Sequence, residues 1–219
     1  MDVKAIHELQ RLGRQMLTDG LVWGNGGNIS VRTGPESFLI TGSGASLGDL
    51  QDSDFVECSL SGEVLRAAGR RPSKEAPMHG AVYAARPDVN AVVHSHPFYG
   101  LLMAVSCEEV PASWFVENMY YLERVARVPY HHPGSKELAE AVGANAQKAN
   151  LLILDNHGIL ALDTNLSEAY TAMQTLEVTS RLYVASKAAG IAVPGLSPEL
   201  VAEFLRESGY KPRREWPRA

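Results

Sequence analysis

The sequence predicts an α/β protein in which helices surround a mixed or antiparallel sheet. Helical and strand-like segments alternate along the chain, and the strands are short, with several close enough to be joined as hairpins. No G-x-G-x-x-G follows a strand and no G-x-x-x-x-G-K occurs, so dinucleotide-binding and P-loop folds are not indicated. With 219 residues, 45% of them hydrophobic, the chain can form one large core. We expect one domain over residues 1–210 and a basic C-terminal tail over residues 211–219.

Apolar periodicity and end signals predict the helices. Gly20 stops the first helix, Pro87 ends the second, and Ser197 followed by Pro198 opens the last. Ser73 is the expected N-cap of the second helix. The helices are expected at residues 3–19, 73–86, 97–105, 135–149 and 167–189, and from residue 197 onward.

Short apolar and β-branched runs predict the strands. A turn at residues 60–63 (LSGE) indicates a hairpin. Residues 107–133 show no clear pattern apart from one short strand. The strands are expected at residues 29–32, 37–40, 55–58, 89–96, 125–128, 151–154 and 158–161.

Charge and composition exclude several classes of protein. The net charge is −5, and because residues 211–219 carry +3, the rest of the chain carries −8. An acidic body argues against sequence-independent binding to nucleic acid, and we expect the tail to be loose or packed on a neighbouring subunit. No apolar run approaches the roughly 20 residues of a membrane span, and the N-terminus lacks the apolar stretch of a signal peptide. Cys58 and Cys107 form no C-x-x-C pair, so we expect a reducing, cytoplasmic location.

A pair of histidines is the densest chemical signal. In residues 92–97 (VVHSHP), His94 and His96 are two apart on a predicted strand, so their side chains share a face. Two imidazoles directed at one point suit Zn²⁺ or another borderline divalent ion. His157 is the best third ligand, since it follows an apolar strand and precedes Gly158, where the backbone can bend. Three protein ligands would leave a position open for substrate.

Other interpretations remain open on these residues alone. The three histidines could be ordinary residues of a strand edge and a turn. His131 and His132 form a rival pair, but adjacent side chains on a strand diverge. Glu75, in the first turn of the predicted second helix, is a candidate general base beside a metal. Local sequence alone favours a carboxylate that only complements the helix dipole.

Two glycine-rich segments indicate an anion site. Residues 23–30 (WGNGGNIS) and 41–46 (TGSGAS) enter or leave strands, and successive backbone N–H groups in such turns can form anion-binding hollows. Ser73 and Lys74 would add a hydroxyl, a cation and a helix N-terminus. Each segment by itself is more often a plain loop, but together they predict a site for one phosphate group.

Taken in order, these motifs resemble the class II aldolase/adducin family. Each motif is unspecific by itself, whereas the ordered combination is specific and spans about residues 5–190. The matching segments are residues 27–32 (GNISVR), 41–44 (TGSG), 72–75 (PSKE), 78–79 (MH), 91–96 (AVVHSH) and 156–158 (NHG).

The resemblance implies a fold, an assembly and a site. The fold would be a single-domain, three-layer α/β/α structure with a central mixed, mostly antiparallel sheet, assembled as a homotetramer with active sites between subunits. His94, His96 and His157 would bind Zn²⁺, with Mn²⁺ or Co²⁺ as alternatives, and Glu75 would be the catalytic acid/base. The positions that match or adjoin the family's phosphate-holding residues are Asn28, Thr41, Gly42, Ser43, Ser73 and Lys74.

The resemblance also implies an activity. The first hypothesis is a zinc-dependent aldolase that cleaves or forms a small phosphorylated ketose through a metal-stabilised enediolate, giving dihydroxyacetone phosphate and an aldehyde. Lys74 stands where fuculose-phosphate aldolases of the family often have a second serine. Together with residues 45–48 (ASLG), 128–130 (VPY) and 133–134 (PG), Lys74 resembles slightly more the branch that decarboxylates a phosphorylated 3-oxo acid of the 3-oxo-tetronate 4-phosphate type. A third hypothesis, a non-catalytic adducin-like assembly module, is weakened by the complete histidine set.

One further residue is a candidate for catalysis. Tyr210, close to the tail, could reach a neighbouring active site as a mobile acid. Residues 111–115 (PASWF) lack the tyrosine that some aldolases use for the aldehyde hydroxyl. The plainer interpretation of Tyr210 is a surface tyrosine that packs the last helix.

Overall fold

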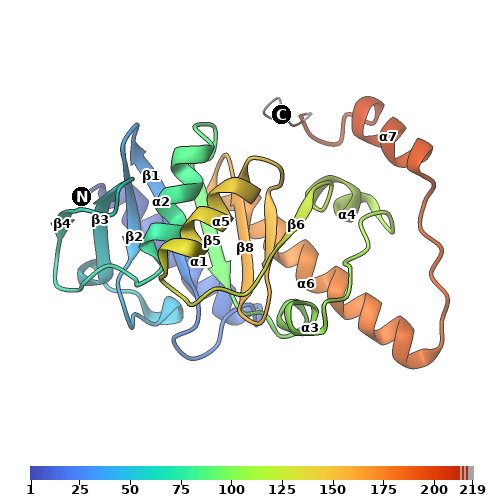
Figure 1. Ribbon diagram of the computed structural model, residues 1–219, viewed down its shortest axis with the longest axis horizontal. Helices are drawn as coiled ribbons and strands as arrows, with labels where there is room; N and C mark the ends of the chain where they lie inside the picture. Colours follow the sequence, from blue (N-terminus) through green and yellow to red (C-terminus); the bar gives the residue numbers. More distant parts are fainter. Residues whose placement is uncertain (213, 215, 217–219) are drawn as a thin grey trace.

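The computed structural model describes residues 1–212, 214 and 216 (Figure 1). Within this part of the chain, eight strands form one sheet in the order β4-β3-β2-β1-β5-β8-β7-β6. All neighbouring strands are antiparallel except β6 and β7, which are parallel. The strands are β1 (Asn28–Gly34), β2 (Ser37–Thr41), β3 (Phe55–Ser59), β4 (Val64–Ala67), β5 (Ala91–Ser95), β6 (Val125–Val128), β7 (Leu151–Leu154) and β8 (Gly158–Asp163).

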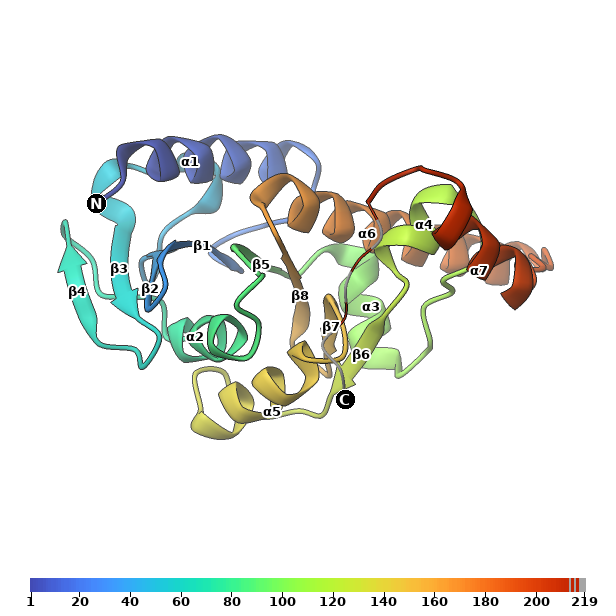
Figure 2. The same cartoon turned by 90° about the horizontal axis from the view of Figure 1, so that it is seen from above.

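Helices cover both faces of the sheet. Figure 2 shows α1 and α6 on one face and α2 and α5 on the other. The predicted three-layer α/β/α fold with a mixed, mostly antiparallel sheet is therefore confirmed. The helices are α1 (Val3–Thr18), α2 (Ala76–Ala85), α3 (Phe98–Ser106), α4 (Val116–Tyr121), α5 (Lys136–Ala146), α6 (Leu166–Ala189) and α7 (Pro198–Glu207), with single 3₁₀ turns η1 (Leu47–Asp49) and η2 (Asp52–Asp54).

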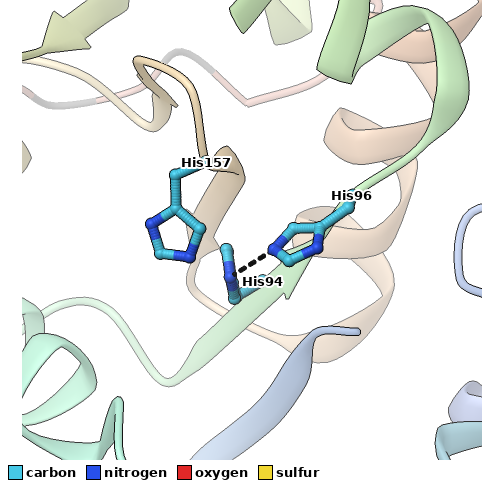
Figure 3. Close-up of side chains that lie close together, drawn as sticks. All are labelled: His94, His96 and His157. Carbon is cyan, nitrogen blue, oxygen red and sulfur yellow. Dashed lines mark hydrogen bonds between the residues drawn. The ribbon is translucent and has the colours of Figure 1, made fainter. Parts of the chain in front are cut away.

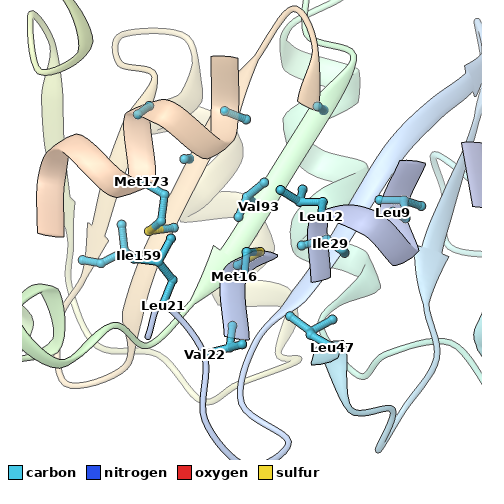
Figure 4. Close-up of a cluster of buried hydrophobic side chains, with 14 of the residues drawn as sticks. Leu9, Leu12, Met16, Leu21, Val22, Ile29, Leu47, Val93, Ile159 and Met173 are labelled. Atoms are coloured by element: carbon cyan, nitrogen blue, oxygen red, sulfur yellow. The ribbon is translucent and has the colours of Figure 1, made fainter. Parts of the chain in front are cut away.

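Two hydrophobic cores lie on the two faces. Alternation along the strands separates them: Ile29 and Val93 point to the core beneath α1 and α6, drawn in Figure 4. Val92 points to the core beneath α2 and α5. Each fully buried aliphatic side chain contributes about 1.5–3 kcal/mol to folding. The central strands β1, β5 and β8 are covered on both faces, and the site is built at their ends.

The second helix begins later than expected. Its first residue is Ala76 and Glu75 occupies the N-cap position, so the prediction of Ser73 as N-cap was wrong. Proline lacks an N–H and is tolerated only in the first turn of a helix, so Pro77 does not fit the fourth position of a helix capped at Ser73. The Ser73 hydroxyl instead accepts a hydrogen bond from the Glu75 N–H at 3.2 Å.

The described part of the tail packs on its own chain. Arg214 lies 2.7 Å from the Asp163 carboxylate. The Trp216 ring receives the guanidinium groups of Arg86 and Arg124, whose central carbons lie 5.6 and 4.4 Å from the ring centroid. The expectation of a loose or neighbour-bound tail was wrong for these residues, because their charges and ring find partners within the subunit. Residues 213, 215 and 217–219 of the predicted tail lie outside the described residues.

None of the helices in the described part of the chain combines the length and the apolar character needed to cross a bilayer.

Candidate functional site

Three histidines meet where β5 ends and β8 begins. His94 lies in β5, whereas His96 lies one residue beyond the strand's last residue, so they are not strand neighbours as expected. His157 lies in the turn between β7 and β8. The His94 and His96 Nε2 atoms are 3.1 Å apart, and candidate ligand atoms of all three residues lie within 4.8 Å of one another (Figure 3). The chain thus brings together all three predicted ligands.

Local contacts orient these imidazoles. His94 Nδ1 lies 2.9 Å from the Ile159 carbonyl oxygen, so Nδ1 donates to this oxygen and Nε2 faces the cluster. Gly158 makes room for the neighbouring ring, since a Cβ at this position would lie 2.3 Å from His96 Cδ2. The Trp23 indole N–H donates to the His96 carbonyl oxygen at 3.0 Å and fixes the backbone there.

The Glu75 carboxylate lies against two of the histidines. Oε1 is 2.9 Å from His157 Nε2, and Oε2 is 3.3 Å from His94 Nε2. Glu75 stands at the N-terminus of α2 and is only 9% exposed. Burial alone would raise the pKa of this carboxyl, but His94 and His157 outweigh burial and hold it below its ordinary value. Glu75 is therefore an ionised, buried base beside the histidine cluster.

The donor set fits a divalent ion. Two nitrogen ligands that each lie about 2.0–2.1 Å from a tetrahedral ion are roughly 3.3 Å apart, close to the separation of His94 and His96 Nε2. Burial and the neighbouring imidazoles lower the pKa of His96 to about 3, so this ring is neutral, as a ligand must be. The nitrogens of the three rings face one another, and the Glu75 carboxylate lies against two of them. The cluster is therefore arranged around a point that a cation can occupy.

The segments predicted to hold phosphate converge beside Glu75. The Ile29 N–H donates to the Thr41 hydroxyl at 3.2 Å, and Gly42 forms a bridge with Pro72. The Ser43 N–H donates to the Arg71 carbonyl oxygen at 2.9 Å. Three loops that are distant in sequence are thus neighbours in the fold.

One detail of that prediction needs correction. We expected the backbone N–H groups of the TGSGAS segment to form an anion hollow, but the N–H of Gly42 donates to the Asp54 carbonyl oxygen at 2.6 Å, and Ser43 is engaged as described above. Both donors are used to join neighbouring segments. The hydroxyl of Ser43 and the ammonium of Lys74 belong to exposed residues and remain accessible.

Asn28 has partners that the sequence analysis did not anticipate. Its side-chain N–H donates to Glu75 Oε2 at 2.7 Å, and its amide oxygen lies 2.6 Å from His79 Nε2. His79 was overlooked as a site residue. Its spacing was a usable signal, since Glu75, His79 and Tyr83 are four residues apart and so lie on one face of a helix.

Tyr210 lies away from the histidines of its own subunit. Asp163 is the last residue of β8, whereas the histidines surround the first, and Arg214 of the tail contacts Asp163. Tyr210, four residues before Arg214, packs its ring against Tyr120 and Phe204. Figure 1 shows this segment at the opposite end of the sheet from the turn between β7 and β8.

Comparison with known proteins identifies the family. The family model described as "Class II Aldolase and Adducin N-terminal domain" matches residues 7–184, most of the chain. This protein belongs to the class II aldolase and adducin family. The predicted resemblance is confirmed, and the histidine cluster lies within the matched residues.

Relatives with different activities are similar to this chain. The 3-oxo-tetronate 4-phosphate decarboxylase of Haemophilus influenzae is 34% identical over 79% of this chain and 83% of its own. The 5-deoxy-D-ribulose 1-phosphate aldolase of Bacillus thuringiensis is 33% identical over 94% of this chain and 97% of its own. A solved structure of L-fuculose 1-phosphate aldolase is 28% identical and superposes with a TM-score of 0.86, covering 96% of this chain and 98% of that one.

Proposed function

We propose that this protein is a zinc-dependent aldolase that forms or cleaves a small phosphorylated ketose, with dihydroxyacetone phosphate and an aldehyde as the other partners. The observation that carries the proposal is the meeting of His94, His96 and His157 beside the buried carboxylate of Glu75. Two relatives named as sugar-phosphate aldolases, which this chain matches over nearly its full length, support the substrate class.

The three imidazoles would hold the ion and Glu75 would move the proton. When bound by these residues, zinc would supply a Lewis acid for the substrate's carbonyl oxygen and would offset negative charge that develops there. Glu75 takes a proton from the carbon beside that carbonyl, or returns it, since it is ionised and within 3.3 Å of His94 and His157. A site of imidazole nitrogens generally binds Mn²⁺ and Co²⁺ with lower affinity than Zn²⁺, so zinc is our first choice.

The phosphate group would lie beside the α2 N-terminus. The residues proposed to position it are Asn28, Thr41, Gly42, Ser43, Ser73 and Lys74. Lys74 supplies the positive charge and the exposed Ser43 hydroxyl a neutral donor. Holding the phosphate in place orients the reacting carbons, a contribution worth up to about 7–11 kcal/mol in ideal cases.

We also propose a homotetramer with active sites between subunits. Helices α3 and α6 pack against each other and expose several large apolar side chains, among them Phe98, Val105, Val178 and Leu182. Apolar side chains gathered on adjacent helices are typical of interaction surfaces. In such an assembly Tyr210, which is remote from its own histidines, would act as a mobile acid at a neighbouring site. Sedimentation analysis and a Tyr210→Phe variant test the two statements separately.

The activity is tested by condensation. The purified protein, loaded with zinc, is mixed with dihydroxyacetone phosphate and a panel of small aldehydes, and the ketose phosphates formed are identified by mass spectrometry. We expect at least one condensation product, lost in Glu75→Gln. If no product forms with any aldehyde, the aldolase proposal is wrong.

A second candidate is a metal-dependent decarboxylase of a phosphorylated 3-oxo acid. It is favoured by the exposed ammonium of Lys74, which can bind a substrate carboxylate, and by the 34% identity to a decarboxylase. Release of carbon dioxide from such a substrate, without condensation activity, would select this alternative. Neither candidate requires nucleic acid or a membrane, and the free thiols of Cys58 and Cys107 accord with a cytoplasmic location.

A further inference from the structure

A chain of hydrogen bonds runs from Glu75 into the core between α2 and the sheet. Glu75 Oε2 accepts from the Asn28 amide at 2.7 Å, and the Asn28 oxygen lies 2.6 Å from His79 Nε2. His79 Nδ1 lies 2.7 Å from the Ser30 hydroxyl, which lies 2.8 Å from the Tyr83 hydroxyl. Four successive contacts thus connect the carboxylate to a tyrosine inside the core.

The chemistry of these groups decides which atom donates and which accepts in each hydrogen bond of this hydrogen-bond chain. An ionised carboxylate only accepts, so the Asn28 NH₂ must face Glu75 and its oxygen must face His79. Burial lowers the pKa of His79 to about 3, so the ring is neutral and its single N–H must be at Nε2. Nδ1 then accepts from Ser30, which accepts from Tyr83. Every donor in the chain points toward Glu75.

The elements place these five side chains in line. Glu75, His79 and Tyr83 follow one another at intervals of four on and just before α2, so they share a helix face. Asn28 and Ser30 are two apart on β1 and share the face of the sheet that α2 covers. The hydrogen-bond chain therefore passes back and forth between α2 and β1 and connects the helix to the strand.

These groups are deeply buried. Ser30 and His79 are 0% exposed and Tyr83 is 1% exposed. Burying polar groups costs free energy unless each is hydrogen-bonded, and apolar side chains of similar volume would fill the same space without that requirement. Packing alone does not explain an imidazole and two hydroxyls behind the one carboxylate of the histidine cluster.

We propose that His79 is a positioning residue that acts through Asn28 to hold the Glu75 carboxylate in place for proton transfer. The hydrogen-bond chain fixes the orientation of the Asn28 amide. A donor at His79 Nε2 holds the amide oxygen on the side away from Glu75, so the NH₂ group faces the carboxylate. It also holds Oε2 at one position, so the carboxylate cannot rotate away from His94 and His157. This inference rests on the proposed function of Glu75.

The first experiment determines the direction of the hydrogen-bond chain without substrate. Nitrogen NMR of the histidine rings in the zinc-loaded protein reports the tautomer and charge of each ring, and His79→Gln identifies the His79 signals. We expect neutral His79 with its proton on Nε2 at pH 7. A ring without a proton on Nε2 could not donate to the Asn28 oxygen, and this result would overturn the proposal.

The second experiment measures the effect on proton transfer. The zinc-loaded protein is incubated with dihydroxyacetone phosphate in deuterated water, and exchange of the substrate's carbon-bound hydrogen is followed by proton NMR. We expect His79→Leu to lower kcat roughly 10–100-fold with KM and zinc content unchanged. His79→Gln should recover most of the rate, because its side-chain amide can donate from the place of Nε2.

A matched pair of tyrosine variants separates positioning from general loss of packing. Tyr83→Phe removes the donor at the far end of the hydrogen-bond chain. Tyr121→Phe removes the hydroxyl of another tyrosine that is 1% exposed, which donates to Glu168 in the other core. We expect a lower kcat in Tyr83→Phe and an unchanged kcat in Tyr121→Phe. Equal effects of the two substitutions on kcat would overturn the proposal.

The outcomes distinguish this inference from the proposed function. If the wild-type protein does not exchange the hydrogen, the aldolase proposal fails and the role of His79 fails with it. If the wild type exchanges and folded His79→Leu exchanges equally fast, only the positioning role fails. Should His79→Leu not fold, Ser30→Ala decides, since it removes the donor to Nδ1, and an unchanged kcat there would contradict the proposal.

Discussion

Strand β8 has a buried polar cluster at each end, and the two clusters are built differently. At Asp163, the last residue, the carboxylate is paired with Arg214 at 2.7 Å and accepts from the Thr164 N–H at 2.8 Å. Around Gly158, the first residue, three imidazoles each direct a nitrogen toward one common point. The tail cluster is one pair of opposite charges, whereas the histidine cluster brings three like rings together around one carboxylate.

The difference indicates what each cluster is for. Removing one partner of the buried Asp163–Arg214 pair would leave the other charge without compensation, which lowers the stability of the fold. Imidazoles that crowd one another reduce stability unless something binds between them. Such local conflict in an otherwise consistent structure is typical of functional sites. We therefore expect substitutions at the histidine end to alter activity and substitutions at the tail end to alter stability.

The largest effect is expected for Glu75→Gln. Because the amide cannot take up a proton, turnover should fall roughly 10²–10⁴-fold, the usual contribution of a general base. Zinc content should stay unchanged. Turnover is measured by exchange kinetics and zinc content by elemental analysis, on the same preparation. Glu140→Gln, at a residue of α5 with a 65% exposed side chain, is the control and should change neither. Unchanged turnover in Glu75→Gln would show that another group moves the proton.

His96→Ala should come next, through loss of metal. Removing one of three ligands should lower zinc affinity by more than the roughly 10–100-fold seen when only a ligand's partner is changed. Competition with a chelator measures the affinity. His131→Ala, from the pair that lies elsewhere in the chain, should keep the wild-type affinity. Full zinc occupancy in His96→Ala would remove this residue from the ligand set.

Arg214→Ala tests the other end of β8. It leaves the Asp163 carboxylate, 7% exposed, without its ion-pair partner, so the free energy of unfolding should fall by about 1–3 kcal/mol. Urea unfolding measures this change, and turnover below the unfolding range should be retained. A loss of turnover without a loss of stability would reverse the comparison and connect the tail to catalysis, as proposed for Tyr210.

The last expected effect is the dependence of the free energy of unfolding on pH. The pKa of His79 is about 3 in the folded protein against 6.5 ordinarily, so between these values the unfolded chain binds the proton and the folded one does not. As pH falls below 6.5, this residue should therefore lower the free energy of unfolding by about 1.4 kcal/mol per pH unit. The contribution of His79 to stability should be greatest above pH 6.5.

His79→Gln isolates that contribution. The groups that face His79, namely Glu75, His94 and Tyr83, are present in both proteins, so the difference in slope belongs to the substituted ring. Urea unfolding at pH 7, 6 and 5 measures both slopes in the metal-free protein. Equal slopes would show that His79 is not held neutral by burial.

Much of the fold was predictable from local sequence. Gly20 adopts the left-handed conformation just past α1, and the Ser197 hydroxyl caps α7 by accepting from the Leu200 N–H. These signals act within a few residues, so they are present in the sequence alone. Helix α4 was missed because it spans only six residues and its N-cap, Phe115, makes no side-chain cap. The histidine motifs were also recognisable, because residue type and spacing restrict their chemistry.

Only the tertiary structure decided which distant residues meet. The pairing of β1 with β5 sets Asn28 opposite His94, and the packing of α2 on that face brings Glu75 and His79 to them. The tertiary structure also pairs the N–H groups of Gly42 and Ser43 with backbone carbonyl oxygens of neighbouring segments, and it places Arg214 of the tail beside Asp163. The sequence determined the elements and the metal-binding residue types, since both depend on short-range chemistry. Strand order and packing depend on how the whole chain buries its apolar surface, and they decided how the site is assembled.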